Sequence, residues 1–66
     1  MKGKLLASAA SLERITALIN QYYCSSNQVY AVNMEDGTVY DTNNGAIRAN
    51  VLVRKANGRY RFEMKG

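Results

Sequence analysis

The fold is decided in residues 51–65, which read VLVRKANGRYRFEMK and hold an Asn-Gly pair between two runs of alternating apolar and polar side chains. Such a pair is the strongest short-range signal for a β-hairpin with a two-residue loop. The loop fixes the register, placing Val53 opposite Phe62 and Arg54 opposite Arg61. The same register predicts three further pairs: Lys55 with Tyr60, Leu52 with Glu63, and Val51 with Met64. One face of the hairpin is therefore apolar, and the other holds two arginines directly across from each other.

Two more turns extend this register toward the N-terminus. Four strands are predicted, over residues 29–34, 38–42, 47–55 and 59–65. The first turn is a Glu-Asp-Gly loop, whose length of three residues places Val32 opposite Tyr40. The Asn-Gly loop at 44–45 brings Asp41 opposite Arg48 as an ion pair. Because a one-residue slip would turn every side chain to the other face, the agreement across three turns predicts one shared apolar face.

Residues 8–23 are predicted to form an amphipathic helix. Apolar side chains recur there at intervals of three and four residues, at Leu12, Ile15, Leu18, Ile19, Tyr22 and Tyr23. Ser8 or Ser11 is expected to cap the first turn by accepting a backbone hydrogen bond. Asn20 falls on the polar side. The apolar stripe of this helix needs a cover, and the apolar face of the strands provides it.

The expected fold class is α+β: an N-terminal helix packed on one face of a four-stranded antiparallel β-meander, in chain order α-β-β-β-β. Residues 1–66 are expected to make one small domain, in which residues 1–7 fray or extend the helix. The opposite sheet face is expected to expose four apolar side chains: Val29, Ala31, Val39 and Leu52. The competing fold is an all-β dimer or tetramer, in which apolar faces of several copies meet and the helix is loose.

The composition argues against catalysis and against bound cofactors. The chain has no histidine, five acidic residues and one cysteine, Cys24. It therefore lacks the common acid–base groups of enzymes, an internal disulfide and the ligands of a zinc site. We expect no enzyme activity, no metal, no cofactor and no small-molecule substrate. A lone cysteine is typical of a reducing compartment, which predicts a cytoplasmic location, and no apolar run reaches the length of a membrane span.

Charge is the one feature of the sequence with functional content. The net charge is +4, and residues 46–66 hold six basic residues against one acidic residue, a net charge of +5. Five of these basic side chains are expected on the polar face as an anion-binding or partner-binding site: Arg48, Arg54, Arg59, Arg61 and Lys65. Arginine binds phosphates and carboxylates through two nitrogens at once, so the expected partner is an acidic protein surface or a nucleic-acid backbone.

Two alternatives stay open at this point. The basic residues could simply keep an exposed sheet face soluble. A homodimeric protein-interaction or structural module with no nucleic-acid role is the second alternative, since so small a core is often stabilised by oligomerisation. The nucleic-acid hypothesis is weakened by Tyr60 and Phe62, which are predicted to point to the core rather than to stack on bases beside the arginines.

Overall fold

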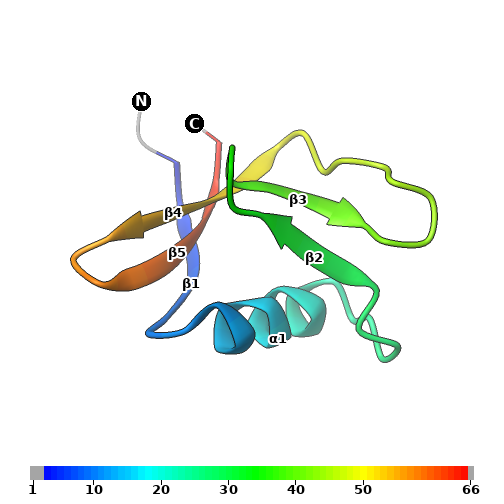
Figure 1. The fold of residues 1–66 in the computed structure, drawn as a ribbon, viewed down its shortest axis with the longest axis horizontal. Helices are drawn as coiled ribbons and strands as arrows, with labels where there is room; N and C mark the ends of the chain where they lie inside the picture. Colours follow the sequence, from blue (N-terminus) through cyan, green and yellow to red (C-terminus); the bar gives the residue numbers. More distant parts are fainter. Residues whose placement is uncertain (1–2, 66) are drawn as a thin grey trace.

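The computed structural model describes residues 3–65, and within them it holds one helix and five strands in two antiparallel sheets (Figure 1). The elements follow in chain order: β1 (Leu5–Ala9), α1 (Leu12–Tyr22), β2 (Tyr30–Asn33), β3 (Thr38–Asp41), β4 (Val51–Ala56) and β5 (Arg59–Met64). The first sheet has the strand order β1-β5-β4, and the second is the β2-β3 hairpin. The predicted α+β class is confirmed, whereas the predicted single four-stranded meander is wrong.

The β4-β5 hairpin has the predicted register. Its loop residues have positive φ angles, 53° at Asn57 and 76° at Gly58. A two-residue turn that follows the twist of its strands requires such angles. All five predicted pairs are observed, among them Arg54 opposite Arg61.

Strand β1 is the first departure from the prediction. Its residues were expected to fray or to belong to the helix, but they pair antiparallel with β5, with Ala7 opposite Phe62 and Ser8 opposite Arg61. Residues 1 and 2 of the segment expected to fray lie outside the described residues. The pairing makes β5 the central strand of its sheet, so that β1 and β4 are the two edge strands.

Helix α1 consequently begins later than predicted. Ser11, one of the two predicted caps, accepts a hydrogen bond from the Arg14 main-chain N–H at 3.2 Å. This bond satisfies one of the N–H groups that a helix start leaves unpaired. The helix packs against β1, β2 and β5 and so contacts both sheets. The buried core between them consists of Ala9, Ile15, Ile19, Val39, Val51, Val53 and Phe62.

Asn20 is fully buried, although the helical pattern places it on the polar side. Its amide nitrogen donates to the Tyr30 carbonyl at 3.0 Å, and its amide oxygen accepts from the Tyr30 N–H at 2.9 Å. The same nitrogen also donates to the Thr16 carbonyl at 2.9 Å. Asn20 thus hydrogen-bonds β2 as a neighbouring strand would, and it joins the helix to the second sheet.

The β2-β3 hairpin is shifted by one residue from the prediction. Val32 lies opposite Val39 rather than Tyr40, because the turn has four residues instead of three. The shift turns Val39 inward, where it is fully buried rather than on the outer face. The Asp36 carboxylate closes the turn by accepting hydrogen bonds from the Thr38 hydroxyl and N–H at 2.7 and 3.0 Å. These bonds lower the pKa of Asp36.

The predicted strand over 47–55 is broken. Only its C-terminal part forms β4, while Ile47 makes one isolated bridge to Tyr40 and is 58% exposed. The Gly45 N–H bonds to the Asp41 carbonyl at 2.7 Å, so the expected two-residue loop is replaced by a wider turn. This irregular segment separates the two sheets.

The two sheets meet at Gly37. Its carbonyl accepts a hydrogen bond from the Val53 N–H of β4 at 2.7 Å. Gly37 has a φ of 75°, and a Cβ at this position would lie 2.3 Å from the Val53 carbonyl oxygen. Glycine is required here for both reasons, since a side chain would be strained in conformation and would collide with β4.

Candidate anion-binding face

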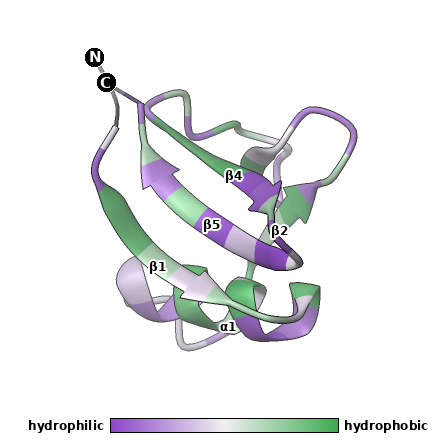
Figure 2. Ribbon diagram, turned by 90° about the vertical axis from the view of Figure 1, so that its left-hand side faces the viewer, coloured by the Kyte–Doolittle hydropathy of each residue, from purple (hydrophilic) through white to green (hydrophobic). Residues whose placement is uncertain are grey.

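We call the face of the three-stranded sheet that is turned away from α1 the outer face. Its side chains lie in three cross-strand rows: Leu5–Glu63–Leu52, Ser8–Arg61–Arg54 and Arg59–Ala56. Figure 2 shows β5 between β1 and β4, with hydropathy alternating along its length. Because successive side chains of a strand point to opposite faces of the sheet, this alternation places the polar side chains of β5 together on one face. The outer face is therefore the polar side of the register that the sequence predicts.

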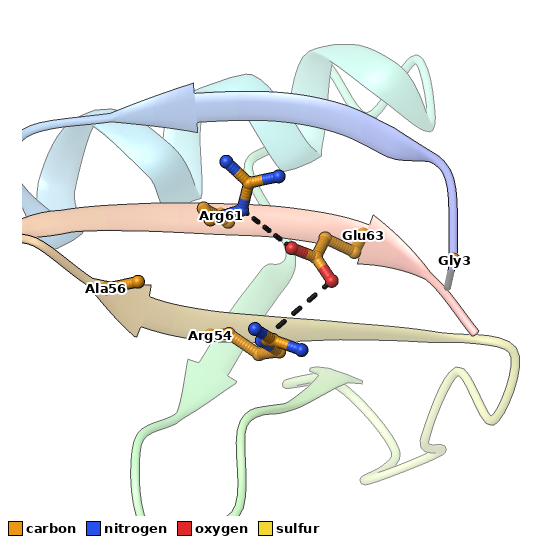
Figure 3. A pocket seen from close by; sticks show the side chains of 5 residues that line it. All are labelled: Gly3, Arg54, Ala56, Arg61 and Glu63. Carbon is orange, nitrogen blue, oxygen red and sulfur yellow. Dashed lines mark hydrogen bonds and ion pairs between the residues drawn. The ribbon is translucent and has the colours of Figure 1, made fainter. Parts of the chain in front are cut away.

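Glu63 lies between the two arginines that face each other across the hairpin (Figure 3). Its Oε2 accepts a hydrogen bond from Arg61 Nε at 2.7 Å, and its Oε1 lies 3.9 Å from Arg54 Nε. The Glu63 side chain is only 11% exposed, with Leu5 and Leu52 as its cross-strand neighbours. The negative charge of Glu63 thus offsets repulsion between the two arginines.

A shallow hollow of about 290 Å³ opens over this group and is lined by Gly3, Arg54, Ala56, Arg61 and Glu63. Both arginines approach Glu63 through Nε, and no hydrogen bond within residues 3–65 uses their terminal Nη nitrogens. Figure 3 shows the Nη nitrogens of Arg61 pointing away from the carboxylate. The side chains of Arg54 and Arg61 are 61% and 41% exposed, so these donors are open to an incoming oxyanion.

Two other predicted site residues lie outside the hollow. Arg59 is exposed at the start of β5, in the outer-face row with Ala56. Lys65 follows β5, and its main-chain N–H bonds to the Asn50 carbonyl at 2.8 Å. The pKa of Asp36, lowered mainly by its hydrogen bonds from Thr38, is lowered further by the charge of Lys65.

Arg48, the fifth predicted site residue, is not on the outer face, so its predicted placement is wrong. Its Nη2 donates to the Tyr30 hydroxyl, and its guanidinium carbon lies 5.2 Å from the centre of the Tyr30 ring and 5.7 Å from that of Tyr23. The hydrogen bond to Tyr30 raises the pKa of Arg48. Tyr30, rather than the predicted Asp41, is therefore its partner, and Arg48 joins β2 to the end of α1 by cation–π contacts.

The sequence prediction placed Glu63 on the polar face, opposite Leu52, but did not name it as a site residue, and it missed Leu5 and Ser8. A signal for Glu63 was present, because Arg61 and Glu63 are two positions apart and share a face on any strand. Leu5 and Ser8 had no such signal, since they reach the face only through the distant pairing of β1 with β5.

The chemistry available on this face is charge and hydrogen bonding. Across the described residues, no group of three or more His, Cys, Asp or Glu side chains could hold a metal ion. No helix in residues 3–65 is long and apolar enough to cross a membrane. No family model, curated protein or solved structure matches the chain, so the functional inference depends on the geometry of the outer face.

Proposed function

We propose that this chain is a non-enzymatic binding protein whose outer face docks on an acidic surface of another protein. The observation that carries the proposal is the pair of Arg54 and Arg61, which approach Glu63 through Nε and keep their Nη donors exposed. A carboxylate can accept two such donors at once. Because Glu63 orients the arginine side chains before binding, less side-chain entropy is lost when a partner docks.

Charge on the outer face favours an acidic partner. Arg54, Arg59 and Arg61 contribute three positive charges against the one negative charge of Glu63, a net charge of +2. Complementary charge of this kind raises association rates and rejects basic partners. Its range is about 8 Å at physiological ionic strength, so the contact must be close.

Apolar neighbours favour a protein over a nucleic acid. Leu5 is 43% exposed beside the arginine row, and Leu52 is half-buried across the sheet. Protein interfaces combine arginine with apolar side chains, whereas proteins that bind single-stranded nucleic acids stack bases on exposed aromatic rings. Phe62 is buried, and Tyr60 lies with Lys55 on the core side of the sheet, so neither ring is placed beside the arginines.

The test is a set of binding titrations with poly-L-glutamate, single-stranded DNA and duplex DNA, at low salt and at about 150 mM salt. Arg61→Gln should weaken poly-L-glutamate binding several-fold. Arg14→Gln is the matched control, because it removes the same charge from an exposed position on α1 and should have little effect.

Three results would overturn the proposal. Equal losses in Arg61→Gln and Arg14→Gln would show that only net charge matters. Tighter binding of DNA than of poly-L-glutamate at matched charge would favour a nucleic-acid partner. A dimer by light scattering that Arg61→Gln dissociates would favour the homodimeric alternative.

A further inference from the structure

Strand β1 leaves one of its edges unpaired within residues 3–65. The strand bonds to β5 on one side, and the sheet ends there. Figure 2 shows β1 at the margin of the sheet, with β5 on its inner side and α1 below. Its sequence, Leu-Leu-Ala-Ser-Ala, contains no charge and no proline, which are the usual means of preventing an edge from pairing with another strand.

The direction of the backbone groups on this edge follows from the hydrogen-bond pattern. The Met64 N–H of β5 donates to the Lys4 carbonyl at 2.8 Å, so the main chain of Met64 points toward β1. In an antiparallel sheet this direction alternates along the strand, so the main chain of Arg61 points away from β1 toward β4. Ser8 lies opposite Arg61. Its N–H and C=O therefore point outward from the sheet, where another strand can bond to them.

The side chains beside this edge are arranged for an acidic strand. Ser8, Arg61 and Arg54 form one cross-strand row on the outer face. A residue paired with Ser8 from outside would add its side chain to the same row. Two strand spacings, about 10 Å, would separate its backbone from that of Arg61, a distance that a glutamate and an arginine side chain span together. The small Ser8 side chain leaves the path between them open.

We infer that β1 accepts an extended acidic segment of the partner protein as a fourth strand. The residue opposite Ser8 then places its carboxylate on the Nη donors of Arg61. This inference depends on the proposed function and names the part of the partner that the outer face receives. A second copy of β1 fits less well, because it would bring no carboxylate to the arginines. The register shift between Leu5 and Ala7 limits regular pairing to a short stretch, so the arginines must contribute much of the affinity.

The experiment compares two polyanions of matched length and charge. Poly-L-glutamate has backbone amides that can join a sheet, whereas polyacrylate has carboxylates but no amides. Poly-L-glutamate should bind more tightly than polyacrylate. Ser8→Pro should weaken the binding of poly-L-glutamate about fivefold, the effect of one lost main-chain hydrogen bond. Polyacrylate binding should not change in Ser8→Pro. Because the Ser8 N–H points away from β5, proline there removes no bond of the sheet.

Amide hydrogen exchange on the unmodified protein gives an independent readout that does not require Ser8→Pro to fold. Exchange of the Ser8 amide should slow in poly-L-glutamate and stay unchanged in polyacrylate. Equal affinity for the two polymers, with unchanged Ser8 exchange, would overturn the added strand but leave the proposed function intact. Failure of both polymers to bind at low salt would overturn the proposed function itself. A dimer that Ser8→Pro dissociates would assign the edge to a second copy.

Discussion

Replacing Glu63 with glutamine tests whether this carboxylate holds the arginine pair. Glu63→Gln keeps the shape of the side chain and one acceptor for the Arg61 Nε–H, but it removes the one negative charge that pairs with Arg54 and Arg61 within residues 3–65. The two arginines then face each other without a counter-charge. We expect the variant to fold and to be less stable.

The size of the loss follows from the geometry. A hydrogen bond that involves a charged group contributes about 1.5–3 kcal/mol; the bond between two charged groups lies toward the upper end of this range, and the bond in the variant, where only the arginine is charged, lies toward the lower end. The 2.7 Å bond is short, but Arg61 is 41% exposed, so solvent screens part of the difference. Repulsion between like charges across the strands adds about 0.2–1 kcal/mol. The expected destabilisation is about 1–2 kcal/mol, which lowers the melting temperature of so small a domain by about 4–16 °C.

The assay is thermal and urea unfolding of Glu63→Gln beside Glu35→Gln. Glu35 is exposed in the β2-β3 turn, so its substitution makes the same change in net charge without touching the arginines. The deficit of Glu63→Gln should shrink at about 1 M salt. The double variant Glu63→Gln, Arg61→Gln should lose less than the sum of the two single changes. A Glu63→Gln protein as stable as Glu35→Gln would refute the role of Glu63.

Three further predictions concern the turns and the buried amide. Gly37→Ala should destabilise the fold by about 3 kcal/mol or more, because the new Cβ meets both a positive φ and a collision with β4. Gly45→Ala has the same φ of 75° but open space around it, so urea unfolding should show a smaller loss of about 1–2 kcal/mol. Asn20→Asp should cost about 3 kcal/mol, since a buried carboxylate cannot donate to the two carbonyls that the amide serves, and thermal melts would detect this. Because the pKa of Asp36 is lowered in the folded state, its carboxylate stabilises the fold at pH values above the ordinary pKa of 3.8. This stabilisation is lost as the pH falls through the lower folded-state pKa. In urea unfolding, Asp36→Asn should therefore lose less stability than the unmodified protein as the pH falls across that range.

Local signals account for the parts of the fold that the sequence predicted correctly. The Asn57-Gly58 loop leaves one register for its hairpin, and all five pairs follow from it. The predicted register of the β2-β3 hairpin was wrong because a Glu-Asp-Gly turn suits loops of three or four residues. The hydrogen bonds from Thr38 to Asp36 favour the loop of four. Strand β1 was not predicted, for a different reason. Its pairing depends on β5 at the other end of the chain, which no local pattern reveals.

The candidate site was predicted in part for the same reasons. Arg54 and Arg61 were placed together because they belong to the hairpin with the clear loop. Arg48 was misplaced because its position depended on a strand that the structure breaks before β4. Asn20 shows a further limit of the sequence prediction. Helical periodicity assigns an asparagine to the polar side, yet the Asn20 amide is buried and bonds to the main chain of β2.

The most direct test of the account is a chemical-shift titration of ¹⁵N-labelled protein with poly-L-glutamate, following the main-chain amides and the arginine Nε–H groups. The account predicts that the largest changes gather on the outer face, at Arg54, Arg61 and Glu63, with Ser8 at their margin. Changes centred instead on Arg48 and α1, or spread evenly over all basic residues, would contradict the claim that the outer face binds the acidic partner.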